Sequence, residues 1–330
     1  MSKEEEGENQ DEVYERIKNS RFKQQNLPAW RPVPTIGSTT VIFMTLGIIF
    51  VALGIIILVY AKKIKEIEIR YDDKCDNINK YCCVDFKVDK KMEKDIMVYY
   101  RLDNFYQNHR RYVKSKSDDQ LKGEKVKNKT LEDDCDPVVT NGEMRKKKNY
   151  LGDEVLIDEE IAIPCGLIAQ SFFNDNFTIG STCNNISDTN FSIENNVENK
   201  IPIDETNIAW SADKKNKYKN YKDMSKQWTN MTDEHFIVWM RPAALPNFRK
   251  LWGRIKQDLD VGEYKLIIGN NYNVSKFKGK KYIILSNINK FGGNNKFLGI
   301  CYIIVGGISI ILSIVFIIGY SIHQKKEKEE

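Results

Sequence analysis

The sequence predicts a membrane protein in which two transmembrane helices flank one large ectodomain of the α+β class. We expect this ectodomain to be β-rich, with antiparallel strands in a sandwich-like arrangement stabilised by disulfides. Three observations carry this prediction. Two uncharged apolar segments lie near opposite ends of the chain, apolar and polar residues alternate between them, and six of the seven cysteines also lie between them.

The N-terminal tail, residues 1–40, has two parts. Residues 1–19 are acidic and polar, so we expect them to be disordered. Residues 22–34 contain Phe22, Leu27, Trp30 and three prolines, which favour an extended path over a helix. From composition alone, this segment fits either the membrane interface, which Trp and Arg favour, or docking onto a partner protein. The interface is the favoured interpretation at this point.

The two apolar segments are residues 41–61 and 297–322, and neither contains Asp, Glu, Lys, Arg or His. Each exceeds the roughly 20 residues that a helix needs to cross a hydrocarbon core. Because they are apolar on every face, neither is expected to be a half-buried helix of a soluble protein. The long preceding tail and the lack of a small-residue cleavage site argue against a cleaved signal peptide. The tails 1–40 and 323–330 therefore share one side of the membrane, and residues 62–296 lie on the other.

Two features assign residues 62–296 to the lumenal or extracellular side, which leaves both termini cytosolic. Six Asn-X-Ser/Thr glycosylation sequons lie there, at Asn128, Asn176, Asn185, Asn190, Asn230 and Asn273. The cysteines of this region are even in number and none lies in a tail, as expected in an oxidising compartment. Charge counts beside the first span do not decide the orientation, because large domains are translocated largely regardless of charge.

The pattern of apolar residues in the ectodomain predicts its secondary structure. Alternation and branched or aromatic residues predict strands at Ile64–Tyr71, Val84–Val88, Ile96–Tyr100, His235–Met240, Tyr264–Ile268 and Lys281–Ser286. Helical spacing predicts short helices at Asn104–Val113 and Pro246–Ile255. Two Asn- and Lys-rich segments, 184–207 and 213–223, are expected to be surface insertions.

Composition argues against several function classes. The net charge of +5 is small and the basic residues are not clustered, so nucleic-acid binding is not expected. No nucleophile, phosphate-loop or zinc-site motif occurs, so we expect no catalysis, no metal and no cofactor. The spans carry no charged residue of the kind that marks transport routes, so the chain alone is not expected to transport an ion.

Small residues recur on one face of the second span. Gly299, Gly306 and Ser313 are spaced by seven residues, and Gly47 and Gly54 have the same spacing in the first span. Small residues allow another helix to approach closely in lipid. Glycine is also common in membrane helices without such a role, but the spacing favours a stable helix partner.

Seven ordered segments together resemble one family, the non-catalytic β-subunits of lipid flippases, which are accessory subunits of type IV P-type ATPases. The segments are FKQQNLPAWRP at 22–32, IKEIEI at 64–69, YYRLDNFYQNHRRYV at 99–113, PCGLIAQSFFND at 164–175, IAW at 208–210, FIVWMRPAALP at 236–246 and FGGNNKFLG at 291–299.

The resemblance implies a heterodimer with the catalytic ATPase, which moves phospholipid from the exoplasmic to the cytosolic leaflet. It implies that the accessory chain is needed for exit of the ATPase from the endoplasmic reticulum and for activity, in a route through the Golgi, endosomes and plasma membrane. It also implies partner contacts, at Leu27, Pro28, Trp30, Arg31 and Pro32, at Arg110 and Arg111, and at Gly299, Gly306 and Ser313.

The family pairs the cysteines at the positions of Cys135 and Cys165, so the resemblance implies this disulfide. A second bridge is expected from Cys75 to Cys82 or Cys83, with Cys82 preferred, which leaves Cys83 free or paired with Cys183. The chain departs from the family here, because the first cysteine cluster commonly holds four cysteines and has three in this sequence.

The alternative from another class is a two-span ligand-gated channel or cell-surface receptor subunit. It predicts a homotrimer and a polar pore-facing stripe on the second span, whereas the stripe here contains only glycine and serine. An ectoenzyme is a third and weaker alternative.

Overall fold

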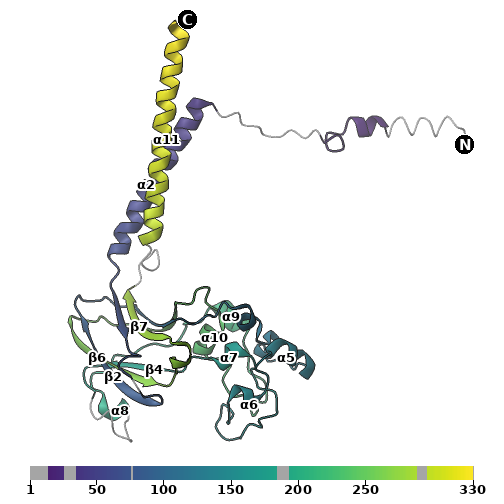
Figure 1. The fold of residues 1–330 in the computed structure, drawn as a ribbon, viewed down its shortest axis with the longest axis vertical. Coiled ribbons are helices and arrows are strands. Elements are labelled where there is room, and N and C mark those ends of the chain that lie inside the picture. The colour runs from purple at the N-terminus through teal and green to yellow at the C-terminus, as the bar shows by residue number, and fades with distance from the viewer. Residues whose placement is uncertain (1–13, 26–34, 76, 184–192, 288–295, 330) are drawn as a thin grey trace, which may run out of the picture. The chain divides into compact units, whose positions relative to one another are not determined.

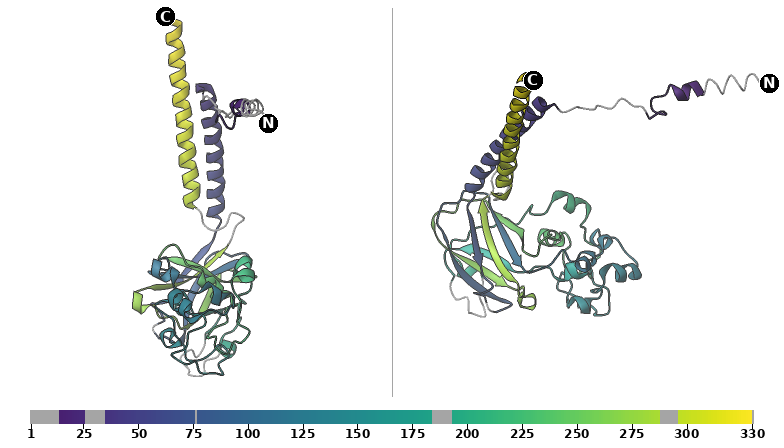
Figure 2. Two further views of the ribbon diagram at one scale, coloured as in Figure 1. Left: turned by 90° about the vertical axis from the view of Figure 1, so that its right-hand side faces the viewer. Right: turned by 45° about the horizontal axis from the view of Figure 1, so that its top comes forward.

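The computed structural model describes residues 14–25, 35–75, 77–183, 193–287 and 296–329. The chain forms two compact units, Met1–Ile56 with Phe297–Glu330, and Ile57–Lys296. The first unit contains two long helices, α2 (Ile36–Lys62) and α11 (Lys296–Glu329). Both are long and apolar enough to cross a membrane. They run side by side in Figures 1 and 2.

Both helices extend beyond the apolar segments that predicted them. α2 begins at Ile36, five residues before the predicted span, because the Thr35 hydroxyl accepts a hydrogen bond from the Ser38 amide at 3.2 Å and caps the helix. Residues 14–18 form a short helix, so the expectation of disorder over 1–19 is wrong for this part. Residues 1–13 lie outside the described residues.

The second unit contains two antiparallel sheets (Figure 1). The first has the order β1 (Glu66–Arg70), β7 (Lys280–Asn287), β3 (Ile96–Asp103) and β5 (Phe248–Ile255). The second has the order β2 (Lys80–Val88), β6 (Gly262–Asn270) and β4 (Asn176–Gly180). The first strand of the ectodomain therefore pairs with its last, with Glu66 opposite Ser286.

Short helices complete the ectodomain, and several of them gather beside the strands (Figure 2, right). They are α3 (Arg110–Lys114), α4 (Asp118–Leu121), α5 (Asn128–Cys135), α6 (Asn141–Met144), α7 (Leu167–Gln170), α8 (Ile193–Asn196), α9 (Ser211–Asn216), α10 (Glu234–Met240) and the 3₁₀ helix η1 (Ser275–Phe277). The architecture agrees with the predicted class, a β-rich antiparallel α+β domain between two apolar helices.

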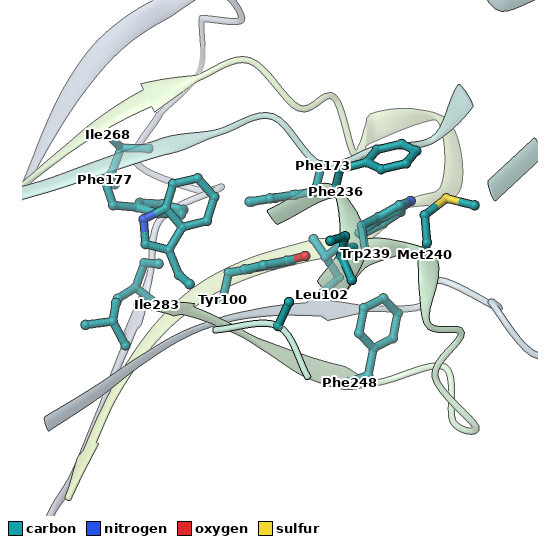
Figure 3. Close-up of a cluster of buried hydrophobic side chains, with 14 of the residues drawn as sticks. Tyr100, Leu102, Phe173, Phe177, Phe236, Trp239, Met240, Phe248, Ile268 and Ile283 are labelled. Atoms are coloured by element: carbon teal, nitrogen blue, oxygen red, sulfur yellow. The ribbon is translucent and has the colours of Figure 1, made fainter. Parts of the chain in front are cut away.

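Aromatic side chains from both sheets meet in the core (Figure 3). The rings of Phe177 on β4 and Trp252 on β5 lie 5.0 Å apart between centroids. Tyr100 on β3 stacks on Phe173 at 4.0 Å. Trp239 of α10 is fully buried in the same cluster. The sandwich and the helix beside it thus share one hydrophobic core, which is the dominant favourable contribution to folding.

For two segments the predicted type of secondary structure is wrong: one predicted strand is a helix, and one predicted helix is a strand. His235–Met240, predicted as a strand, forms α10. The Asp233 side chain accepts hydrogen bonds from the amides of His235 and Phe236, which caps the helix at its start. The helix then buries its apolar residues in the core. The aspartate immediately before an apolar run was the missed signal of a helix N-terminus.

Pro246–Ile255, predicted as a helix, instead contains β5. This strand pairs with β3, with Ile255 opposite Ile96, and Phe248, Lys250 and Trp252 alternate inward. A lysine at a buried strand position hides the two-residue period, so the prediction followed the helical spacing of the remaining apolar residues.

The strand predicted at Ile64–Tyr71 is shorter in the structure, as β1, and the remaining predicted strands lie within β2, β3, β6 and β7. The helix predicted at Asn104–Val113 appears only as α3, which begins after His109, whose backbone is extended with a ψ of 131°. Segment 213–223 is not purely a surface insertion, since Asp213 and Tyr218 are buried. Within 193–207, Val197 and Ile201 are also buried.

Candidate interaction and stabilising sites

The small residues of α11 contact the small residues of α2. A Cβ atom added at Gly306 would lie 2.8 Å from the Gly47 carbonyl oxygen, and one added at Gly54 would lie 2.8 Å from the Gly299 carbonyl oxygen. The Ser313 hydroxyl donates to the Thr40 carbonyl at 3.1 Å. We call this contact the glycine seam. It exists because the absence of side chains lets the two backbones approach closely.

The glycine seam corrects the partner-contact prediction for Gly299, Gly306 and Ser313. The spacing correctly indicated a helix–helix contact, but the contacting helix belongs to the same chain. Ser313 is fully buried in this contact. These three positions are therefore occupied, and a partner helix would contact other faces of α2 and α11.

The remaining predicted partner contacts lie in two places. Arg110 and Arg111 are exposed at the start of α3, and Arg111 lies 3.6 Å from Asp136 in a solvent-exposed ion pair. Such a pair contributes little to stability, about 0–1 kcal/mol, so the two guanidinium groups remain accessible for another contact. The strip formed by Leu27, Pro28, Trp30, Arg31 and Pro32 lies outside the described residues.

The ectodomain contains three disulfides within the described residues. Cys135 at the end of α5 is bonded to Cys165, with a Cα–Cα distance of 5.7 Å. Cys75 is bonded to Cys82. Cys83 is bonded to Cys183, so of the two possibilities left open for Cys83 the structure has the paired one. Cys301 in α11 is a free thiol.

A buried ion pair connects the two sheets. The Lys281 Nζ atom on β7 donates to Asp175 Oδ2 at 2.7 Å, to Asn270 Oδ1 at 2.5 Å and to the Tyr272 carbonyl at 2.7 Å. The side chains of Lys281 and Asp175 are 2% and 0% exposed. The Tyr71 hydroxyl, just after β1, also donates to Asp175 at 2.7 Å. Each proton of the ammonium group thus has an acceptor, which a buried charge requires.

The other oxygen of the Asp175 carboxylate is also matched, because the backbone amides of Asn271 and Tyr272 donate to it, each at 2.6 Å. Burial lowers the pKa of Lys281, and the neighbouring Asp175 opposes this shift by favouring the ammonium form. Burial, together with Asp175, raises the pKa of Tyr71 well above its ordinary value, so its hydroxyl stays a donor. We call these groups the Asp175 network.

A second buried lysine stabilises the end of α10. Lys250 Nζ donates to the carbonyls of Val238, Trp239 and Arg241 at 3.0, 2.8 and 2.6 Å. A cation at the carboxyl end of a helix satisfies carbonyls that have no partner in the helix itself. Burial lowers the pKa of Lys250 to about 7, and the positive charge of Arg241 acts in the same direction.

Sequence reasoning missed both lysines and Asp175 as functional groups. Asp175 lies inside the recognised segment 164–175, which was the only signal available for it. Lys250 and Lys281 resemble ordinary surface residues in a lysine-rich chain. Only the packing of β5 and β7 against the second sheet and α10 reveals that they are buried.

The sequons differ in their environment. Asn128, Asn176 and Asn273 are exposed. Asn230 is half-buried, and its side-chain oxygen accepts from Asn220 at 2.7 Å and from the Thr232 hydroxyl at 2.7 Å. Asn185 and Asn190 lie outside the described residues.

One pocket near α9 and α10 is lined by four cationic side chains and encloses about 310 Å³. Its cations are already paired, since Asp213 lies 2.8 Å from Lys217 and 2.9 Å from Arg241. Lys116 is paired with Asp118, and Lys122 lies 3.3 Å from Asp119. No group of three or more His, Cys, Asp or Glu side chains suited to a metal ion occurs among the described residues.

Comparison with known proteins gives a consistent result. The model of the LEM3 (ligand-effect modulator 3) family / CDC50 family matches residues 56–326. ALA-interacting subunit 3 of Arabidopsis thaliana is 38% identical over 94% of this chain and 88% of the relative. Cell cycle control protein 50A of Bos taurus is 37% identical over 91% of this chain and 88% of the relative.

The matched region takes in the C-terminal end of α2, both sheets with the Asp175 network, the three disulfides and most of α11. With this coverage, and with relatives more than 30% identical along almost their whole length, the chain belongs to the LEM3/CDC50 family.

Proposed function

We propose that this protein is the accessory subunit of a phospholipid flippase and forms a heterodimer with a catalytic type IV P-type ATPase. The family match over residues 56–326 carries the proposal. It is supported by relatives whose name, ALA-interacting subunit, describes a subunit of an assembly. The seven recognised segments also point to this class of subunit.

The accessory subunit acts by folding and escorting its partner. It brings the ATPase out of the endoplasmic reticulum and supports translocation of phospholipid from the exoplasmic to the cytosolic leaflet, in the Golgi, endosomes and plasma membrane. The chain itself has no catalytic role in this proposal. What supports this view is an ectodomain whose buried charges serve packing, as in the Asp175 network, and whose pocket cations are paired.

Residues 62–296 are lumenal or extracellular in this proposal, and both termini are cytosolic. Three disulfides support an oxidising compartment. The exposed sequons Asn128, Asn176 and Asn273 support access of the glycosylation machinery. Among them, Asn176 directly follows the recognised segment 164–175 and is expected to be glycosylated. Asn230, Asn185 and Asn190 complete the set of proposed acceptors.

The partner ATPase contacts surfaces that the chain leaves free. Because the glycine seam is internal, the helices of the ATPase contact the exposed aliphatic faces of the pair, such as those around Ile48 and Ile311. The arginines at 110 and 111 are a second contact, since each is exposed on α3. The tail strip 22–34 is the third, on the cytosolic side.

Co-purification tests the proposal. The full chain with a C-terminal tag, extracted in mild detergent from its own cells, is expected to bring down a type IV P-type ATPase in a one-to-one ratio. ATP hydrolysis is expected in this complex and absent from the purified chain alone. A homotrimer without any ATPase would contradict the proposal and favour the channel interpretation.

A second arm tests topology. Glycosidase treatment of material from eukaryotic cells is expected to increase its gel mobility. Unchanged mobility would contradict the lumenal placement of the ectodomain, whatever the outcome of the co-purification.

A further inference from the structure

A groove lies beside α5, and it has the character of a ligand site. It encloses about 370 Å³, within the range of about 300–1,000 Å³ typical of pockets for small molecules. Its apolar lining includes Val126, Ile161 and the half-buried ring of Tyr221. Its lining also includes charged side chains, among them Asp223 and Lys226.

The groove is already formed in the folded chain. Tyr221 is fixed by a hydrogen bond from its hydroxyl to the Glu124 carbonyl at 2.7 Å. Lys226 forms a largely exposed ion pair with Glu160 at 2.9 Å. Pre-formed walls reduce the conformational entropy that an occupant would otherwise have to overcome.

One lining residue is itself a sequon. Asn128, the first residue of α5, lines the groove and is exposed. Its side-chain amide makes no hydrogen bond within the part of the chain that the structure describes. Asn176 and Asn273 are also exposed sequons, but neither lines this groove. A glycan attached to Asn128 would therefore begin at the wall of the groove.

We propose that the groove seats the first N-acetylglucosamine of a glycan linked to Asn128. The inference rests on the lumenal placement of the ectodomain in the proposed function. In the linkage reaction, the Asn128 amide nitrogen bonds to the anomeric carbon of a lipid-linked oligosaccharide, the lipid diphosphate leaves, and the nitrogen loses one proton.

The chemistry of the groove fits this sugar. A pyranose ring has an apolar C–H face, which matches Tyr221, Val126 and Ile161, and aromatic rings offer a broad apolar surface for such contact. Its hydroxyl and acetamido groups can hydrogen-bond with the charged lining residues Asp223 and Lys226. The covalent link also supplies a high effective concentration, so a weak site is filled without a free ligand.

The seated sugar connects three separate segments of the ectodomain. These are α5, the stretch 161–163 and the stretch 221–226, of which the first two lie close to Cys135 and Cys165. The sugar shields apolar lining that is otherwise accessible to water, which stabilises this part of the ectodomain.

Protection from glycosidases tests the proposal on the unaltered protein. Full-length complex carrying high-mannose glycans is incubated under native conditions with an amidase that cleaves the Asn–sugar bond, and occupancy at each sequon is followed by mass spectrometry. Release at Asn128 should be about tenfold slower than at Asn273, because cleavage tracks the population of the unseated state. After denaturation both sites should be cleaved at similar rates.

Two variants sharpen the result. Val126→Asp leaves the sequon intact and places a charge in the groove, so the glycan should remain attached while its protection is lost. Asn128→Gln should lower the melting temperature by about 3–6 °C. The reason is that a tenfold preference of the sugar for the groove stabilises the folded state by the corresponding free energy, which the variant loses. Asn273→Gln, the matched control, should leave the melting temperature unchanged.

An endoglycosidase that leaves one sugar on each asparagine should not lower the melting temperature, since the seated sugar remains. Equal native release at Asn128 and Asn273, or an unoccupied Asn128 beside an occupied Asn273, would overturn the proposal and leave the groove to a free ligand. Absence of glycans at all sequons would instead contradict the topology.

Discussion

The glycine seam between α2 and α11 and the Asp175 network between the two sheets solve opposite problems. The seam is made of glycine and serine positions, and the Ser313 hydroxyl adds a side-chain hydrogen bond from one helix to the other. The network contains a fully buried ion pair in which each polar atom is matched. In lipid the surroundings are as apolar as the side chains, so burial between helices brings no hydrophobic gain. Close van der Waals packing must therefore hold the two helices together. In the ectodomain the burial of apolar side chains supplies the driving force for folding. The network adds specificity, because its buried polar groups are all matched only when the two sheets pack in the observed arrangement.

The largest expected effect comes from breaking the Asp175 network. Lys281→Met removes the cation and leaves the Asp175 carboxylate buried without its charge partner, which costs about 3–5 kcal/mol. The variant should lose folded protein and remain in the endoplasmic reticulum, as measured by thermal unfolding in detergent and by glycan maturation.

The matched control is Lys265→Met, which removes one partner of an ion pair that is largely exposed on β6. It should cost less than about 1 kcal/mol. Equal effects of the two substitutions would show that the buried network contributes no more than a surface pair.

The disulfide beside α5 gives the next effect. Cys135→Ser opens the Cys135–Cys165 bridge, whose cysteines are separated by 30 residues. The chain-entropy model gives a cost of about 3–4 kcal/mol for a loop of this size. The variant should be retained together with its ATPase, as seen by microscopy of the tagged partner.

Cys301→Ala is the control, because Cys301 is a free thiol in α11. Normal export of the Cys135→Ser variant, together with a free Cys165 thiol in the wild-type protein, would contradict the bridge.

The glycine seam is tested by two adjacent residues. A Cβ at Gly306 would lie 2.8 Å from the Gly47 carbonyl oxygen, whereas a Cβ at Gly307 has nothing within 4 Å. Gly306→Ala should therefore separate the helices at a cost of about 1–3 kcal/mol, and Gly307→Ala should leave them paired.

The measurement is disulfide cross-linking of Phe43→Cys to Phe316→Cys in a Cys301→Ala background, since the rings of Phe43 and Phe316 lie 6.1 Å apart. Reduced cross-linking is expected for Gly306→Ala alone. An equal loss for both alanine variants would argue against a contact specific to the seam.

The last expected effect is a dependence of stability on pH, which the glycine and serine positions of the seam cannot contribute. The folded pKa of Lys250 is about 7, below the unfolded value of about 10.4. Between these values the unfolded chain binds more protons, so stability rises with pH, by about 1–3 kcal/mol from this residue.

The melting temperature of the full chain should therefore increase from pH 7 to pH 9.5. In the Lys250→Met variant the melting temperature should depend less on pH, whether the variant is more or less stable than the wild-type protein. An unchanged slope in the variant would show that Lys250 keeps its proton throughout.

The same contrast explains what the sequence could predict. Hydropathy and small-residue spacing identified both spans and the glycine seam, because in lipid the composition of a helix determines much of its role. They did not identify which helix makes the contact, because Gly299 and Gly306 would allow any helix to approach closely. In the ectodomain, alternation predicted β1 and β2, and branched or aromatic residues predicted β3, β6 and β7, whereas the types of α10 and β5 were predicted the wrong way round.

That exchange has a physical reason. Both segments are short and apolar, and the tertiary contacts of Trp239 and Lys250 decide between helix and strand. The groove beside α5 was also invisible to sequence reasoning, because its walls come from three segments far apart in the chain.

The pairing of β1 with β7 has a consequence for synthesis. Residues 66–70 leave the ribosome early, yet their hydrogen-bonding partners lie at 282–286. Until β7 is synthesised, β1 has an unpaired edge, and Tyr71 and Asp175 lack Lys281, which completes their network. Contacts of such long range form slowly. The ectodomain therefore closes only when nearly the whole polypeptide is made, so a prematurely terminated chain is exposed to the cell's folding surveillance rather than passing as a finished subunit.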